Sequence, residues 1–154
     1  MSTGSALFFR CLADSVCVEM GISNIDAVVS RRLRLLRLLQ RVAVEEFADR
    51  FAITADYVSE CELGHTRFEP PHIAAVAEHF KLPIAWFFFT FDDPAFEDAV
   101  LHHVEKAARS QCPRDLQFLS RISEIVVAMP SAKARERGRY VEQARVLLRE
   151  QSCA

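Results

Sequence analysis

Apolar residues recur at intervals of three or four along most of this chain, which is the spacing of one face of an α-helix. Short breaks rich in Gly, Pro, Asn and Asp separate the periodic stretches. The pattern predicts helices or helical turns at residues 5–20, 26–41, 44–51, 55–63, 71–80, 84–88, 94–109, 115–129 and 132–151. Only four glycines occur in 154 residues, which argues against glycine-rich phosphate loops and hairpin-dense sheets. We therefore expect an all-α fold.

Composition narrows the class of protein. Hydrophobic residues make up 51% of the chain and charged residues 26%, which is typical of a packed domain rather than a disordered one. No apolar run approaches the roughly 18 residues that a membrane span requires. The five cysteines are scattered and form no CxxC pair, so we expect reduced thiols that act as small buried hydrophobes. These features predict a cytoplasmic protein.

Charge is distributed unevenly along the chain. Residues 24–43 carry five arginines against one aspartate, whereas residues 44–64 carry six carboxylates against one arginine. The tail at residues 131–154 carries six basic residues against three glutamates. Because the 19 basic and 21 acidic residues nearly balance overall, any contact with nucleic acid depends on this local distribution.

The predicted helix at residues 26–41 has two faces. At 100° per residue, one arc of about 120° holds Arg31, Arg34, Arg37 and Arg41. The apolar arc is wider than one small core requires. We expect the N-terminal helix, the C-terminal helices or a second subunit to cover the remainder.

Residues 44–51 and 55–63 have the pattern of a helix-turn-helix. The first helix places Phe47, Ala48 and Phe51 at inward spacing, and a small residue such as Ala48 allows close crossing. Thr54 is the expected N-cap of the second helix. Gly64 is the expected end of that helix, where a left-handed conformation is favoured.

The stretch from Val29 to Phe88 resembles the Cro/phage-repressor (XRE) family of helix-turn-helix regulators. The motifs that carry the resemblance are, in order, Arg32-Leu33-Arg34, Arg37, Glu46-Phe47-Ala48, Ile53-Thr54, Val58-Ser59, Glu62-x-Gly64, Pro70, Ile73, Ala77, Leu82-Pro83 and Trp86-Phe87-Phe88. The resemblance implies a five-helix repressor-type domain at residues 25–91, with the helix-turn-helix at 43–62. An N-terminal helical extension at 1–24 and a C-terminal helical tail at 92–154 would flank it.

This resemblance further implies a sequence-specific, DNA-binding transcription regulator that acts by occupying an operator. In such domains Arg37 and Glu62 would form a partly buried structural pair. The residues that the resemblance places against DNA are Val44, Thr54, Ala55, Asp56, Tyr57, Ser59, Glu60, His65, Thr66 and Arg67.

The expected groove-facing residues depart from the family pattern. Base edges are read bidentately by Gln, Asn, Arg and Lys, whereas this helix offers Ala55, Asp56, Ser59 and Glu60. Phosphates repel carboxylates, although a carboxylate can accept a hydrogen bond from cytosine N4.

Two interpretations therefore stay open. In the first, DNA affinity comes from the loop at residues 65–67, from the Arg31, Arg34 and Arg41 face, and from a basic tail helix. In the second, the domain has lost the ability to recognise DNA. It then binds a protein partner through its acidic face, as an adaptor or antagonist of a regulator.

The tail is expected to form a helical hairpin joined at Pro130-Ser131, because apolar residues keep a helical spacing on both sides. We also expect a homodimer, since repressor-type domains bind paired half-sites about one DNA turn apart. Met20-Gly21 directly precedes the family-like segment, so translation could begin there and make residues 1–19 an upstream-start artefact. Otherwise those residues could dock on Leu35 and Leu39.

Nothing in the sequence predicts an enzyme, a cofactor or a metal site. It contains no nucleophile elbow and no metal-ligand cluster. His102 and His103 point about 100° apart on a helix, so together with Glu105-Lys106 they indicate a solvated face. The aromatic stretch at residues 86–91 is expected to join the domain to the tail, with a small-molecule effector site as the alternative.

Overall fold

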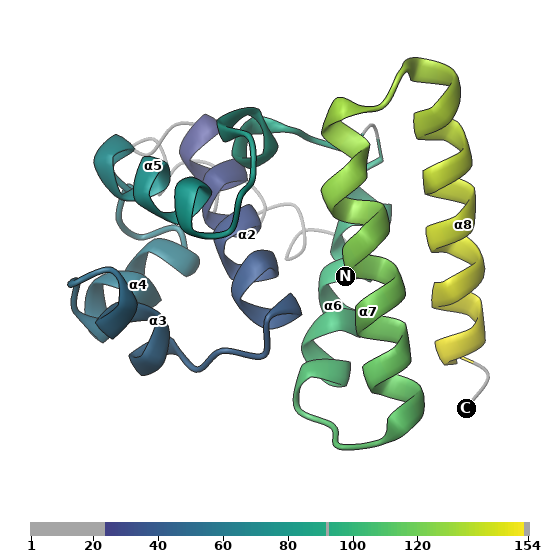
Figure 1. Ribbon diagram of the computed structural model, residues 1–154, viewed down its shortest axis with the longest axis horizontal. Helices are drawn as coiled ribbons and strands as arrows, with labels where there is room; N and C mark the ends of the chain where they lie inside the picture. Colours follow the sequence, from purple (N-terminus) through teal and green to yellow (C-terminus); the bar gives the residue numbers. More distant parts are fainter. Residues whose placement is uncertain (1–23, 92, 153–154) are drawn as a thin grey trace, which may run out of the picture.

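The computed structural model describes residues 24–91 and 93–152, and within these ranges every regular element is a helix (Figure 1). The α-helices are α2 (Asn24–Leu39), α3 (Val44–Arg50), α4 (Ala55–Glu62), α5 (Pro70–His79), α6 (Pro94–Ala108), α7 (Pro113–Ala128) and α8 (Ala134–Ser152). The short 3-10 helices are η1 (Ile84–Phe88) and η2 (Met129–Ser131). The all-α prediction is confirmed for this part of the chain. The helix predicted at residues 5–20 lies outside the described residues.

Local sequence accounts for several helix starts. The Thr54 hydroxyl accepts a hydrogen bond of 3.2 Å from the backbone N–H of Tyr57, which caps α4. The Asp93 carboxylate accepts one of 3.0 Å from the N–H of Ala95 and caps α6 in the same way. Helices α5, α6 and α7 each begin with proline, whose missing N–H costs nothing in the first turn.

Helices α2, α3, α4 and α5 share one kind of ending, a left-handed residue followed by a residue that bonds back to the helix. The left-handed residues are Arg41 (φ 54°), Ala52 (φ 52°), Gly64 (φ 74°) and Lys81 (φ 56°). The N–H groups that bond back belong to Val42, Ile53, His65 and Leu82, at 3.1, 3.1, 2.9 and 2.9 Å. These Schellman caps satisfy end carbonyls and turn the chain sharply.

Helix α2 lies at the centre of the molecule, between α3–α5 and the tail helices α6–α8 (Figure 1). Both sides of α2 are covered, and Leu33, Leu35, Leu36 and Leu39 are all buried. Of the three candidates for covering its wide apolar arc, the C-terminal helices α6 and α7 contact it. The predicted tail hairpin is present as antiparallel α7 and α8 (Figure 1).

An aromatic cluster joins the two sides of the molecule around a buried arginine. The Arg32 side chain is 1% exposed, and its guanidinium lies 4.7–5.6 Å from the ring centres of Trp86, Phe89 and Phe91. Its Nε donates a hydrogen bond of 2.9 Å to the backbone carbonyl of Phe89, and its Nη2 lies 3.4 Å from the Glu97 carboxylate. Burial lowers the pKa of Arg32, and Glu97 opposes that shift. Trp86, Phe87 and Phe91 of the aromatic stretch thus pack in the core between domain and tail, whereas Phe88 is exposed.

Candidate nucleic-acid interface

Helices α3 and α4 form a helix-turn-helix unit whose inner side is apolar. Phe47 and Ala48 of α3 pack with Val58 and Cys61 of α4, and all four are buried. The chain turns between the helices through Ala52, whose left-handed backbone gives the required sharp reversal. This packing fixes which side of α4 faces outward.

The outward side of α4 and the following loop hold most of the residues predicted to face DNA. The exposed ones are Thr54, Asp56, Glu60, His65, Thr66 and Arg67, and the half-buried ones are Val44, Ala55, Tyr57 and Ser59. Ser59 also lines a groove between α4 and the end of α6. The structure therefore brings the predicted residues onto one region, with Ser59 turned toward the tail.

Tyr57 holds the loop after α4 in place. Its hydroxyl donates to the backbone carbonyl of Arg67 and accepts from the N–H of Glu69, both at 3.1 Å. Its ring packs against Phe68 and His72, and burial raises the pKa of Tyr57. Tyr57 therefore positions the loop. The sequence predicted only that Tyr57 faces DNA, and not this structural role.

Polar side-chain contacts tie the loop to its neighbours. His65 Nδ1 lies 3.2 Å from a Glu60 carboxylate oxygen, and Arg67 Nε lies 3.4 Å from Asp26 at the start of α2. The Arg67 side chain remains 64% exposed. Its guanidinium can still reach an incoming anion from this position.

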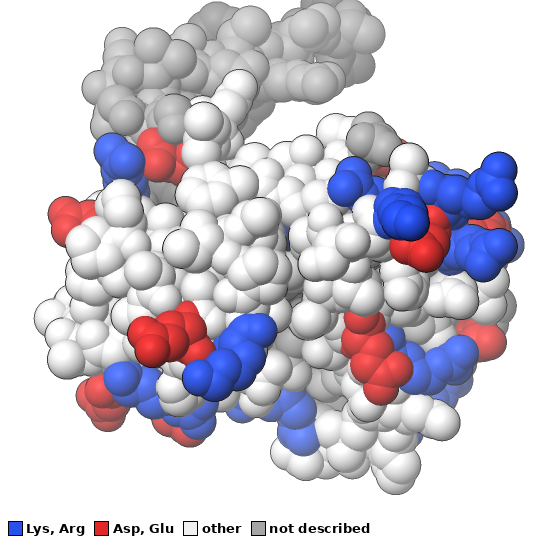
Figure 2. All heavy atoms as spheres, turned by 45° about the horizontal axis from the view of Figure 1, so that its top comes forward, with Lys and Arg blue, Asp and Glu red and all other residues white. Residues whose placement is uncertain are grey.

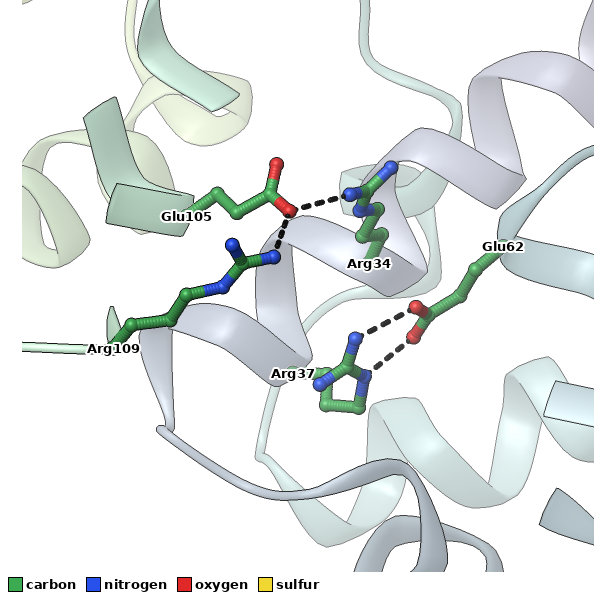
Figure 3. A network of polar contacts seen from close by, with 5 residues as sticks. All are labelled: Arg34, Arg37, Glu62, Glu105 and Arg109. Carbon is green, nitrogen blue, oxygen red and sulfur yellow. Dashed lines mark hydrogen bonds and ion pairs between the residues drawn. The ribbon is translucent and has the colours of Figure 1, made fainter. Parts of the chain in front are cut away.

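The pair that the resemblance predicts between Arg37 and Glu62 is formed, and it anchors α4 on α2 (Figure 3). Two guanidinium N–H groups reach the two carboxylate oxygens at 2.7 and 2.8 Å, and a third donates to the carbonyl of Val42 at 2.9 Å. Their side chains are 12% and 7% exposed. The hydrogen bonds that Arg37 donates to Glu62 raise the pKa of Arg37, against the opposing effect of burial.

Of the three arginines that the first interpretation places toward DNA (Arg31, Arg34 and Arg41), two also contact the tail. Arg34 donates to a Glu105 carboxylate oxygen of α6 at 2.9 Å, and Arg41 donates to the carbonyl of Ser110 at 3.2 Å. Both therefore face the tail, because α6 packs along this side of α2. Arg31 is exposed.

The basic tail segment lies away from α4. Its cations include Lys133, Arg135, Arg137 and Arg139, around the start of α8. Helix α8 is at the opposite end of the molecule from α3 and α4 (Figure 1). Figure 2 shows basic side chains gathered at the end where α7 meets α8. One copy of the chain therefore cannot place these cations beside α4.

The outer surface of the helix-turn-helix is acidic. Its exposed charged residues are Glu45, Glu46, Asp49, Asp56 and Glu60, against Arg50 and the nearby Arg67. Arg50 is paired with Glu46 at 2.5 Å within α3. The acidic surface predicted from the sequence is thus displayed outward by the fold.

The residues considered for metal binding lie apart from this interface. His102 and His103 have ring centres 5.6 Å apart in an edge-on arrangement, and burial lowers the pKa of His103, helped by His102 and Lys106. Among the described residues no group of three candidate ligands is close enough to hold a metal ion. Glu105 is not on a simply solvated face, because it binds Arg34 and Arg109 (Figure 3).

The sequence did not predict that Arg32 is buried. It also did not predict that Glu105 of α6 contacts Arg34 of α2. The spacing of Glu105 and Arg109 at i and i+4 was the available signal for their pairing. Cys61 is buried as expected, whereas Cys112 at the start of α7 is exposed. Cys11, Cys17 and Cys153 lie outside the described residues.

Searches of family models, curated proteins and solved structures give no match to this chain. None of the helices in the described ranges combines the length and the apolar character that crossing a membrane requires. What the chain does is therefore inferred from its own residues and geometry.

Proposed function

We propose that this chain is a cytoplasmic, DNA-binding transcription regulator that acts by occupying an operator. The observation that carries the proposal is the α3–α4 unit. Its second helix is capped by Thr54, anchored by the Arg37–Glu62 pair, and exposed on its outward side at Asp56 and Glu60. A helix-turn-helix binds DNA by laying such a second helix in the major groove.

In this proposal the two parts of the surface have different tasks. Thr66 and Arg67 in the loop contact phosphates and fix the orientation of the domain, which needs no base recognition. Asp56 and Glu60 lie on the exposed side of α4, where a carboxylate can accept from cytosine N4. Specificity then comes from avoided as well as accepted bases, because a carboxylate rejects guanine O6 and N7 acceptors.

The regulator is proposed to act as a homodimer. Two copies related by a two-fold axis would place two α4 helices in successive major grooves, about one turn apart, on an operator with matching symmetry. Helices α7 and α8 lie on the far side of α2 from α3 and α4, so a dimer contact through these two helices leaves the outward side of α4 exposed (Figure 1).

The acidic surface favours a second candidate function. Five carboxylates around α3 and α4 repel phosphates, and one of the two nearby arginines is already paired within α3. A basic protein partner would instead be attracted to this surface. In that case the domain acts as an adaptor or antagonist of a regulator.

A fluorescence-anisotropy titration distinguishes the two functions. The full chain is titrated into labelled DNA from upstream of its own gene and into a scrambled duplex, each at two salt concentrations. Tight binding to the first duplex alone, weakening steeply with salt, supports the operator-binding function. Absence of binding to either duplex at low salt contradicts it. The second function then predicts capture of a basic partner that is lost with Asp56→Asn and Glu60→Gln.

A further inference from the structure

A groove of about 490 Å³ lies where the C-terminal ends of α2, α4 and α6 meet. This volume is within the range of small-molecule sites. Its charged lining residues are Arg34, Arg37, Arg41, Arg109, Glu62 and Glu105. Figure 3 shows five of them, with guanidinium groups from α2 and from the end of α6 approaching the same region. Apolar residues, among them Leu38, Val42 and Leu63, form other parts of the lining.

The positive charges of the groove are only partly neutralised by its carboxylates. Arg37 is matched by the two-point contact with Glu62. Arg34 and Arg109 both reach the same Oε1 atom of Glu105, at 2.9 and 2.7 Å, so two guanidinium groups share one negative charge. Arg41 contacts only the backbone carbonyl of Ser110 here. The lining therefore holds two positive charges more than negative ones.

Most hydrogen-bond donors of these arginines are unused. A guanidinium group has five N–H donors. Within the described residues, the side chains of Arg34, Arg41 and Arg109 each make one hydrogen bond. Arg34 and Arg109 are 32% and 78% exposed, so the free donors are open to a ligand. Proximity to helix C-termini stabilises such cations but does not occupy their donors.

We propose that this groove binds a small phosphate-bearing molecule, with the phosphate held by Arg34, Arg41 and Arg109. The planar guanidinium group matches phosphate oxygens in pairs, and a phosphate dianion neutralises the two surplus charges. An apolar substituent on the phosphate would lie against Leu38 and Leu63. This binding does not depend on whether α4 reads DNA.

The test uses phenyl phosphate as the probe, titrated into the full chain by calorimetry, with phenol as the neutral control. We expect saturable binding of phenyl phosphate and none of phenol. The double variant Arg34→Gln/Arg109→Gln should weaken binding by at least about tenfold, because it removes two charge-assisted contacts. Arg121→Gln is the matched control. It removes an exposed arginine paired with Glu150 on the tail, away from the groove, and should leave binding unchanged.

The variant Glu105→Gln gives a stronger test, because the proposal predicts that its affinity for phenyl phosphate rises. It frees both guanidinium groups from their shared carboxylate and should tighten phenyl phosphate binding several-fold. Absence of saturable binding, or binding that Glu105→Gln leaves unchanged, would overturn the proposal even if the double arginine variant fails to fold. Complete displacement of phenyl phosphate by duplex DNA would also overturn it, because the groove would then belong to the DNA interface.

Discussion

The indole Nε1 of Trp86 donates a hydrogen bond of 3.1 Å to the backbone carbonyl of Val126, and both residues are buried. In a continuing helix this carbonyl would accept from the residue four positions later. That residue is Pro130, which has no N–H. Trp86 therefore supplies the donor that the sequence of α7 lacks, and it links the helix-turn-helix side of the molecule to the tail.

Replacing Trp86 with Phe is expected to destabilise the chain. The substitution leaves the Val126 carbonyl buried without a donor, which costs about 1–3 kcal/mol before any loss of packing. Urea unfolding followed by far-UV circular dichroism measures the change. In a Pro130→Ala background, where residue 130 regains an N–H, the same substitution should cost less. Equal costs in the two backgrounds would show that the hydrogen bond contributes nothing.

The Arg37–Glu62 pair should be worth far more than a surface ion pair. Arg37→Met leaves a carboxylate that is 7% exposed without its partner, and we expect a loss of about 3–5 kcal/mol in the free energy of unfolding. The matched control is Arg50→Met, which breaks the exposed Arg50–Glu46 pair and should cost less than about 1 kcal/mol. Similar losses in the two variants, measured by urea unfolding, would contradict a buried role for Arg37.

Much of the fold follows from local signals in the sequence. Thr54 and Pro94 mark helix starts because capping and the missing proline N–H act within one turn. The helix predicted at residue 115 instead begins two residues earlier, at Pro113. Helix ends were predicted one or two residues late at α2 and α3. Their left-handed cap residues are Arg41 and Ala52, whose identity does not favour that conformation.

The candidate site was less predictable, because its geometry depends on contacts between distant segments. Arg34 and Glu105 are 71 positions apart, so nothing local shows that α6 covers the arginine arc of α2. Arg32 lies among arginines in the sequence, yet the fold encloses it with Phe91 and Glu97. The Arg37–Glu62 contact was expected only because a family motif supplied the pairing.

Cys61 should make stability depend on pH at the alkaline end. Burial raises the pKa of its thiol to about 11, above the 9.0 of an unperturbed thiol. The unfolded chain therefore loses this proton first, and the stability present below pH 9 falls as pH rises toward 11. Over that range the wild type should lose about 2–3 kcal/mol more than Cys61→Ala. Chemical unfolding at pH 8, 9, 10 and 11 measures the difference.

The control for Cys61 is Cys112, the exposed cysteine at the start of α7. Cys112→Ser should leave the pH dependence as in the wild type. It should also remove one rapidly reacting thiol in a native-state titration with a disulfide reagent, whereas Cys61→Ala should remove none. Rapid reaction of Cys61 in the folded chain would contradict its burial.

Arg67 tests the proposed phosphate contact in the loop after α4. If its 64% exposed guanidinium neutralises one phosphate, Arg67→Ala weakens binding to operator and scrambled duplexes alike. It should also reduce the slope of log K against log salt by about one unit. Anisotropy at four or five salt concentrations gives the slope. Arg121→Ala on the tail, checked by size-exclusion chromatography to keep the wild-type oligomeric state, should leave the slope unchanged. An unchanged slope in Arg67→Ala would exclude this residue from the interface.

Asp56 and Glu60 test the recognition helix itself. If these exposed carboxylates merely repel phosphates, replacing both with Gln raises the affinity for any duplex. We expect a rise of about five- to tenfold, which is the size of the repulsion between charges that interact through water at close range. Glu124→Gln with Glu142→Gln makes the same change in net charge on the tail. It should have little effect on affinity when size-exclusion chromatography shows the wild-type oligomeric state. If the carboxylates read bases, the double variant instead loses affinity for the operator while gaining it for the scrambled duplex. Anisotropy on both duplexes at one salt concentration therefore shows which role the acidic residues have.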